Sequence, residues 1–144
     1  MEPTNELIYS GLESLKEGKL VIIVPQGISM LPFIRGGEDR VYLLKREKVE
    51  VGDIVLVHYH GRHILHRVYA MEGDRIRLMG DGNLEGNECV MAEEILGTVM
   101  EIEHNGRRHK PSKAWLWRHL LPFRRILLKL HRKWNKIMGT SQNK

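Results

Sequence analysis

Short β-rich apolar segments, separated by turns that contain Gly or Asp, recur along the first two thirds of this chain. Residues 20–24 form an apolar run closed by Pro25, which predicts a buried strand. Further strand candidates are residues 40–44, 53–60, 63–71, 75–79 and 95–102. Strands at this spacing predict a mainly β fold, either a coiled antiparallel sheet or a partial barrel.

The N-terminal part of the chain predicts one short helix before the first strand. Residues 5–18 carry leucines and an isoleucine at helical spacing, with Asn5 as a possible cap and Gly18 as a stop. The length of 144 residues favours one core rather than two. The single cysteine, Cys89, excludes an internal disulfide framework and any CxxC motif.

Charge divides the chain into two parts. Residues 1–103 hold 11 Lys or Arg and all 18 Asp or Glu, a formal net charge of −7. Residues 104–144 hold 12 Lys or Arg and no acidic residue, a net charge of +12. Such asymmetry predicts an anionic partner for the basic tail.

From Ser112 onward the pattern is that of an amphipathic helix, which Pro122 divides or restarts. The apolar arc holds Trp115, Leu116, Leu120, Phe123, Ile126, Leu127, Leu130, Trp134 and Ile137. One interpretation docks this arc on the sheet, and another lays it on an anionic lipid surface. Nucleic acid is not expected as a partner, because no known reader motif accompanies the charge.

The sequence contains no apolar stretch of the roughly 18 residues that a membrane-spanning helix needs. Its first residues lack the basic and apolar regions of a secretory signal. We therefore expect a cytoplasmic protein or one attached peripherally to a membrane.

Ser29 is the first candidate for chemistry. It lies in Gly27-Ile28-Ser29-Met30, on a corner directly after the predicted first strand. A serine at such a corner can expose its hydroxyl, with backbone N–H groups nearby to hold an oxyanion. Most serines in turns that contain Gly are only turn or capping hydroxyls, so this feature is weak by itself.

A nucleophilic serine needs a base, and His66 is the candidate. A hairpin turning at Gly61-Arg62 would pair His60 with His63 and Val57 with His66. Side-chain alternation then places His66 on the face of Val55, Val57 and Val68. An apolar face favours the neutral imidazole that a general base requires, although a hydrogen-bonded core histidine is the alternative.

The same alternation gathers His58, His60 and His63 on the opposite face, near the hairpin tip. Three imidazoles on one face can bind zinc, but a solvated polar tip is the simpler interpretation, and no metal is expected. Farther along, Asp81 lies in Gly80-Asp81-Gly82-Asn83. This segment is either an ordinary turn or the source of a carboxylate that orients the histidine.

Five motifs in order resemble the conserved boxes of type I signal peptidases, whose fold is shared with LexA-type self-cleaving repressors. They are Gly27-Ile28-Ser29-Met30-Leu31-Pro32, Gly52-Asp53-Ile54-Val55, His66-Arg67-Val68, Gly80-Asp81-Gly82-Asn83 and Gly97-Thr98-Val99. The resemblance spans about residues 19–102. It implies a catalytic domain over residues 1–103, whereas charge and periodicity predict the basic helical tail of residues 104–144.

The His-Arg-Val form of the third box is similar to that of the endoplasmic-reticulum and archaeal enzymes. The resemblance implies Ser29 as nucleophile, His66 as general base and Asp81 as the acidic partner, with no metal or cofactor. At the family's further acidic position Glu88 is the nearest match. Phe33 stands where the family usually has Thr.

The resemblance therefore implies a serine endopeptidase that cleaves signal or leader peptides. The alternative is a non-catalytic module that binds peptides or membranes on the same fold. A self-cleaving repressor is disfavoured, because the 28 residues before Ser29 cannot hold a helix-turn-helix domain and contain no Ala-Gly or Cys-Gly pair.

Overall fold

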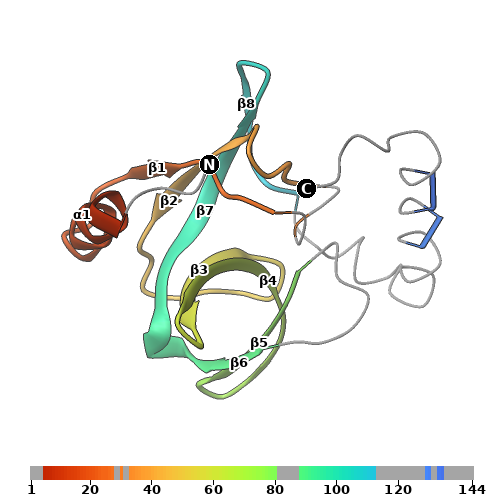
Figure 1. Ribbon diagram of the computed structural model, residues 1–144. Helices are drawn as coiled ribbons and strands as arrows, with labels where there is room; N and C mark the ends of the chain where they lie inside the picture. The colour runs from red at the N-terminus through yellow and green to blue at the C-terminus, as the bar shows by residue number, and fades with distance from the viewer. Residues whose placement is uncertain are drawn as a thin grey trace.

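The computed structural model describes residues 5–27, 30, 33–80, 88–112, 129–130 and 133–134, and this part of the chain is mainly β (Figure 1). One helix, α1 (Asn5–Lys16), precedes the sheet. The strands are β1 (Val21–Ile23), β2 (Arg40–Leu44), β3 (Ile54–Tyr59), β4 (Arg62–Glu72), β5 (Arg75–Met79), β6 (Glu88–Met91), β7 (Ile95–His104) and β8 (Arg107–His109). A short 3-10 turn, η1 (Ala92–Glu94), joins β6 to β7. The predicted fold class is confirmed.

The strands form one antiparallel sheet in the order β1-β2-β7-β3-β4-β5-β6, with β8 paired to β7. The long strand β7 joins the two halves of the sheet, because it pairs with β2 on one side and β3 on the other (Figure 1). The register shifts in the β2–β7, β3–β7 and β4–β5 pairs. Such irregularities increase the local twist, so the sheet coils without closing.

The sheet is buried on both faces at β3. Ile54 and Leu56 belong to a cluster that includes Leu15 of α1, whereas Val55 and Val57 belong to a second cluster on β3 to β7. Gly97 makes room for the helix, because a Cβ there would lie 3.1 Å from the Leu15 side chain. The two clusters hold β3 and β4 between them, and β4 carries His66.

Strand β1 differs from its prediction. It is an edge strand, paired only with β2 in the described part of the chain, and Ile22 is 50% exposed. The expectation of a buried strand is therefore wrong. Leu20 and Val24, at alternate positions around Ile22, are exposed as well.

The β3–β4 hairpin turns one residue earlier than the sequence suggests. His60 and Gly61 occupy the turn with φ values of 50° and 80°, the conformation of a type I′ turn. His58 therefore pairs with His63, and Val55 pairs with His66. The predicted pairs His60–His63 and Val57–His66 are wrong by two residues of register.

The basic segment after residue 103 begins inside the sheet, because β7 continues to His104 and β8 pairs with it. Most of the amphipathic helix predicted from Ser112 onward lies outside the described residues. The described residues 129–130 and 133–134 are helical. Leu130 and Trp134 are 58% and 61% exposed, respectively.

Candidate active site

His66 lies near the middle of β4 with its side chain on an apolar face. It is opposite Val55 across the β3–β4 pair, and only 5% of the residue is exposed. Val55, Val57 and Val68 are all fully buried in the cluster on this face. Strand alternation predicts this face correctly, although the exact pairing is different.

Glu88 provides the carboxylate partner of His66. Its Oε1 lies 2.6 Å from Nδ1 of His66, and the two side chains are 17% and 6% exposed. A carboxylate can only accept, so with Glu88 ionised the imidazole carries its proton on Nδ1 and donates it. The Nε2 atom of His66 then keeps the lone pair that a general base uses.

The sheet register explains why these two side chains meet. Glu88 begins β6 and pairs with Leu78 of β5, which in turn pairs with Val68 of β4. Paired residues project to the same face, so Glu88 shares the face of Val68 and His66. Val90, two residues farther along β6, is buried in the same cluster.

The resemblance alone makes Glu88 only the nearest acidic match and gives the partner role to Asp81. Asp81 lies outside the described residues, as does Ser29. If β6 is recognised as a strand, side-chain alternation places Glu88 on the same face as the buried Val90 and opposite the exposed Cys89. This alternation is the sequence signal that could have identified Glu88.

Gly27 and Met30, on the two sides of Ser29 in the chain, belong to the described residues. Gly27 has a φ of 90°, a conformation that favours glycine. Met30 is 5% exposed and belongs to the same core cluster as Leu65, the residue before His66. Gly27 therefore has a conformation typical of a glycine in a turn, and Met30 packs in the core.

Ser29 lies in the segment of residues 25–37, and backbone contacts bring the two ends of this segment together. The N–H of Gly37 donates to the carbonyl of Pro25 at 2.7 Å. Gly36 packs directly on Gly27, because a Cβ at Gly36 would lie 2.0 Å from the Gly27 carbonyl oxygen. The two ends of the segment thus meet through backbone contacts that leave no room for a side chain.

Arg67 connects this segment to the histidine strand. It is 3% exposed, and its Nη1 donates to the carbonyls of Gly52 and Ser112, each at 2.9 Å. Its guanidinium lies over the ring of Phe33, 5.2 Å from the ring centroid. Arg67, which follows His66 in the sequence, therefore contacts residues of three separate segments of the chain.

The hairpin histidines form a pair rather than a triad. The rings of His58 and His63 have centroids 4.8 Å apart, whereas His60 lies in the turn with its ring against Tyr59. Burial, and secondly the neighbouring His58, lowers the pKa of His63 below its ordinary value. Among the described residues, no group of three or more His, Cys, Asp or Glu could hold a metal ion.

Comparison with known proteins adds no family. No model of a known protein family matches the chain, and a search of curated proteins finds no significant match. In the part of the chain that the structure describes, no helix is long and apolar enough to cross a membrane.

Proposed function

We propose that this protein is a serine endopeptidase that cleaves signal or leader peptides. The observation that carries the proposal is the pairing of His66 with Glu88 on an apolar face, 2.6 Å apart. A buried imidazole with a carboxylate on Nδ1 is oriented and held in the tautomer that general-base catalysis needs. The ordered motifs around Ser29 and His66 supply the nucleophile and the substrate class by resemblance.

In the proposed reaction the Ser29 hydroxyl attacks the scissile carbonyl while Nε2 of His66 takes its proton. The imidazolium then donates this proton to the leaving amine, and water hydrolyses the acyl-enzyme by the same route. Glu88 stabilises the imidazolium through its contact with Nδ1. Asp81 is the second candidate for this role, on the resemblance alone.

The edge strand β1 supports an extended peptide substrate. One side of β1 pairs with β2, and no described strand pairs with the other side. An extended peptide can add to such an edge and present alternate side chains to the protein. The chain leaves β1 and continues directly into the segment that carries Ser29. By resemblance, cleavage follows small side chains.

The exposed apolar side chains of Leu20, Ile22 and Val24 along β1 favour a second function, a module that binds peptides without cutting them. The two functions differ in one experiment, which incubates the purified protein with a peptide library. A peptidase cleaves and loses all cleavage in Ser29→Ala. A binding module retains peptides but yields no products in either variant, and that result would refute the peptidase.

An anionic membrane surface is the proposed partner of the tail. Leu130 and Trp134, one helical turn apart on the predicted apolar arc, are both largely exposed beside exposed Lys129 and Lys133. Exposed apolar and basic side chains on one helix are typical of interfacial helices. This arrangement supports a protein held peripherally on a membrane.

A further inference from the structure

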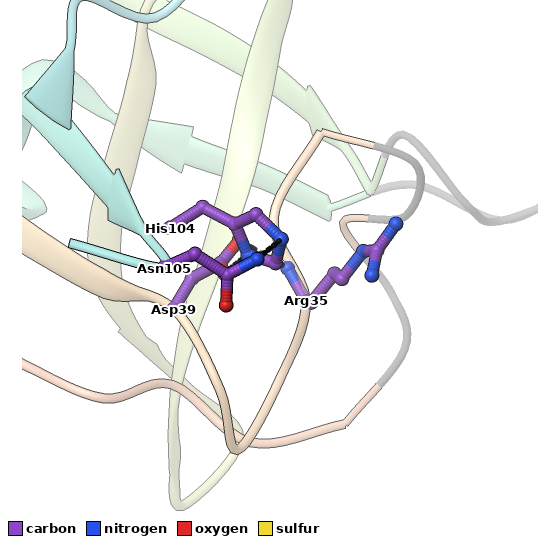
Figure 2. A network of polar contacts seen from close by, with 4 residues as sticks. All are labelled: Arg35, Asp39, His104 and Asn105. Carbon is purple, nitrogen blue, oxygen red and sulfur yellow. Dashed lines mark hydrogen bonds and ion pairs between the residues drawn. The ribbon is translucent and has the colours of Figure 1, made fainter. Parts of the chain in front are cut away.

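Asp39 is a buried carboxylate that the proposed reaction does not use. It directly precedes β2, and only 3% of its side chain is exposed. Its Oδ2 accepts the backbone N–H of Arg35 at 2.8 Å, and its Oδ1 accepts Nδ1–H of His104 at the end of β7 (Figure 2). A buried carboxylate without such partners would be strongly destabilising, so both contacts are needed.

The carboxylate closes a turn at residues 35–39. Besides the contact of Oδ2 with the Arg35 N–H, the backbone N–H of Asp39 donates to the Arg35 carbonyl at 3.0 Å. The guanidinium of Arg35 points away from the carboxylate (Figure 2), so only the backbone of Arg35 takes part. The side chain and the backbone N–H of Asp39 therefore both hold the turn, through the N–H and the carbonyl of Arg35.

This turn holds the two glycines that close the Ser29 segment. Gly36 contacts Gly27, and Gly37 donates to Pro25, so both closing contacts come from the turn that Asp39 fixes. His104 extends the support to the sheet, because it lies in β7 opposite the first residue of β8, Arg107. Asn105 Nδ2, from the following turn, lies 3.2 Å from the other ring nitrogen of His104 (Figure 2).

We propose that Asp39 is a positioning residue for the segment that carries Ser29. Through Arg35 and His104 it fixes the turn of residues 35–39, whose glycines contact Gly27 and Pro25 shortly before Ser29 in the chain. Its catalytic consequence rests on the proposed peptidase function, whereas its effect on the segment does not.

Three variants separate positioning from general stability. Asp39→Ala removes both contacts. Asp39→Asn can keep both contacts: its amide oxygen accepts from the Arg35 N–H, and its amide nitrogen donates to Nδ1 of His104 once the imidazole carries its proton on Nε2 instead. Glu38→Ala is the matched control, since it removes an exposed carboxylate from the same turn.

The first measurement is hydrogen–deuterium exchange of the purified chain. In Asp39→Ala we expect the amides of residues 35–39 to exchange at least about tenfold faster, with β3 and β4 unchanged, because the turn loses the side-chain contacts that oppose its local opening. Asp39→Asn and Glu38→Ala should match the wild type. Unchanged exchange at residues 35–39 in Asp39→Ala would overturn the proposal, whether or not the protein cleaves peptides.

The second measurement is the kinetics of peptide cleavage. A nucleophile displaced by about 1 Å loses on the order of 100-fold in rate, so kcat should fall in Asp39→Ala while KM stays within about threefold. In Asp39→Asn we expect kcat to stay near the wild-type value. An equal fall of kcat in Asp39→Asn and Asp39→Ala would contradict positioning through these contacts. If Asp39→Ala does not fold, His104→Ala decides by exchange: faster exchange at residues 35–39 supports the proposal and unchanged exchange refutes it.

Discussion

The guanidinium of Arg67 lies over the ring of Phe33, 5.2 Å from its centroid, and so joins the segment that carries Ser29 to the strand that carries His66. Cation–π contacts contribute about 0.5–2 kcal/mol, the larger values when the cation is desolvated, and Arg67 is buried.

We expect Phe33→Ala to lower kcat/KM for peptide cleavage by roughly tenfold, the equivalent of about 1.4 kcal/mol. The reason is that the segment loses its side-chain contact with Arg67. Phe33→Tyr keeps an aromatic face and serves as the control, with activity near that of the wild type. Wild-type kinetics in Phe33→Ala would show that the contact does not position the site.

The pair of Glu88 and His66 predicts a large effect on catalysis. Glu88→Ala removes the acceptor at Nδ1 of His66, so kcat should fall by on the order of 10²–10⁴-fold. Glu88→Gln keeps an oxygen that can accept but loses the charge, so its kcat should lie between those of the wild type and Glu88→Ala. Steady-state kinetics with a cleavable peptide provides the measurement.

Asp81→Asn is the companion variant, because the resemblance gives the same role to Asp81. If Glu88 is the partner of His66, Asp81→Asn should change kcat far less than Glu88→Ala does. The reverse order, with Glu88→Ala near wild type and Asp81→Asn inactive, would assign the role to Asp81 instead.

The face of His66 could be predicted from the sequence even though the hairpin register could not. The observed pairs differ from the predicted ones by two residues, and a shift of two preserves the face on which each side chain lies. A shift of one residue would have placed His66 on the opposite face, that of the buried Ile54 and Leu56. The turn lies one residue earlier than the sequence predicts, because the non-glycine residue His60 adopts positive φ as well as Gly61.

The contact of Glu88 with His66 could not be predicted in the same way. Its position depends on β6 pairing with β5, and β6 is a short strand whose sequence, Glu-Cys-Val-Met, carries little local signal. The contact between Arg67 and Phe33 likewise joins residues far apart in the chain. Alternation along one strand is local information, whereas these contacts are set by tertiary packing.

Gly36 predicts a steric effect at the base of the Ser29 segment. In Gly36→Ala the new Cβ would lie 2.0 Å from the Gly27 carbonyl oxygen, so the backbone must move. Overpacking of this kind costs about 1–3 kcal/mol, and we expect lower stability together with reduced cleavage. Gly11→Ala is the control, since its Cβ would meet only a Val21 methyl at 3.4 Å. Equal melting temperatures and activities in both variants would contradict this packing.

The His58–His63 pair predicts how stability depends on pH. Burial, and secondly His58, lowers the pKa of His63 in the folded protein below that in the unfolded chain, so the unfolded chain binds a proton more readily. The contribution of His63 is therefore complete above about pH 6.5, the ordinary histidine value, and is lost as the pH falls from there through the folded-state pKa. Urea unfolding of the wild type and of His63→Gln should show a smaller loss of stability on acidification in the variant. Identical pH profiles would exclude His63 as a contributor.

The basic tail predicts binding to vesicles that contain anionic lipid. Each Lys or Arg near such a surface contributes about 1 kcal/mol, and salt screens this attraction, so binding should weaken steeply between low and high ionic strength. A chain that ends at Lys113 is the informative truncation. It removes eight of the twelve tail cations but keeps Ser112, whose carbonyl accepts from the buried Arg67 beside His66.

Liposome flotation measures this prediction, with a double variant as its matched control. Leu130→Ser with Trp134→Ser leaves every charge in place but removes two exposed apolar side chains, so binding should persist at low salt and weaken at moderate salt. The chain that ends at Lys113 should not float at either salt concentration. If the full-length protein stays in the soluble fraction at low salt, its tail does not bind anionic membranes, and docking of the apolar arc on protein becomes the better interpretation.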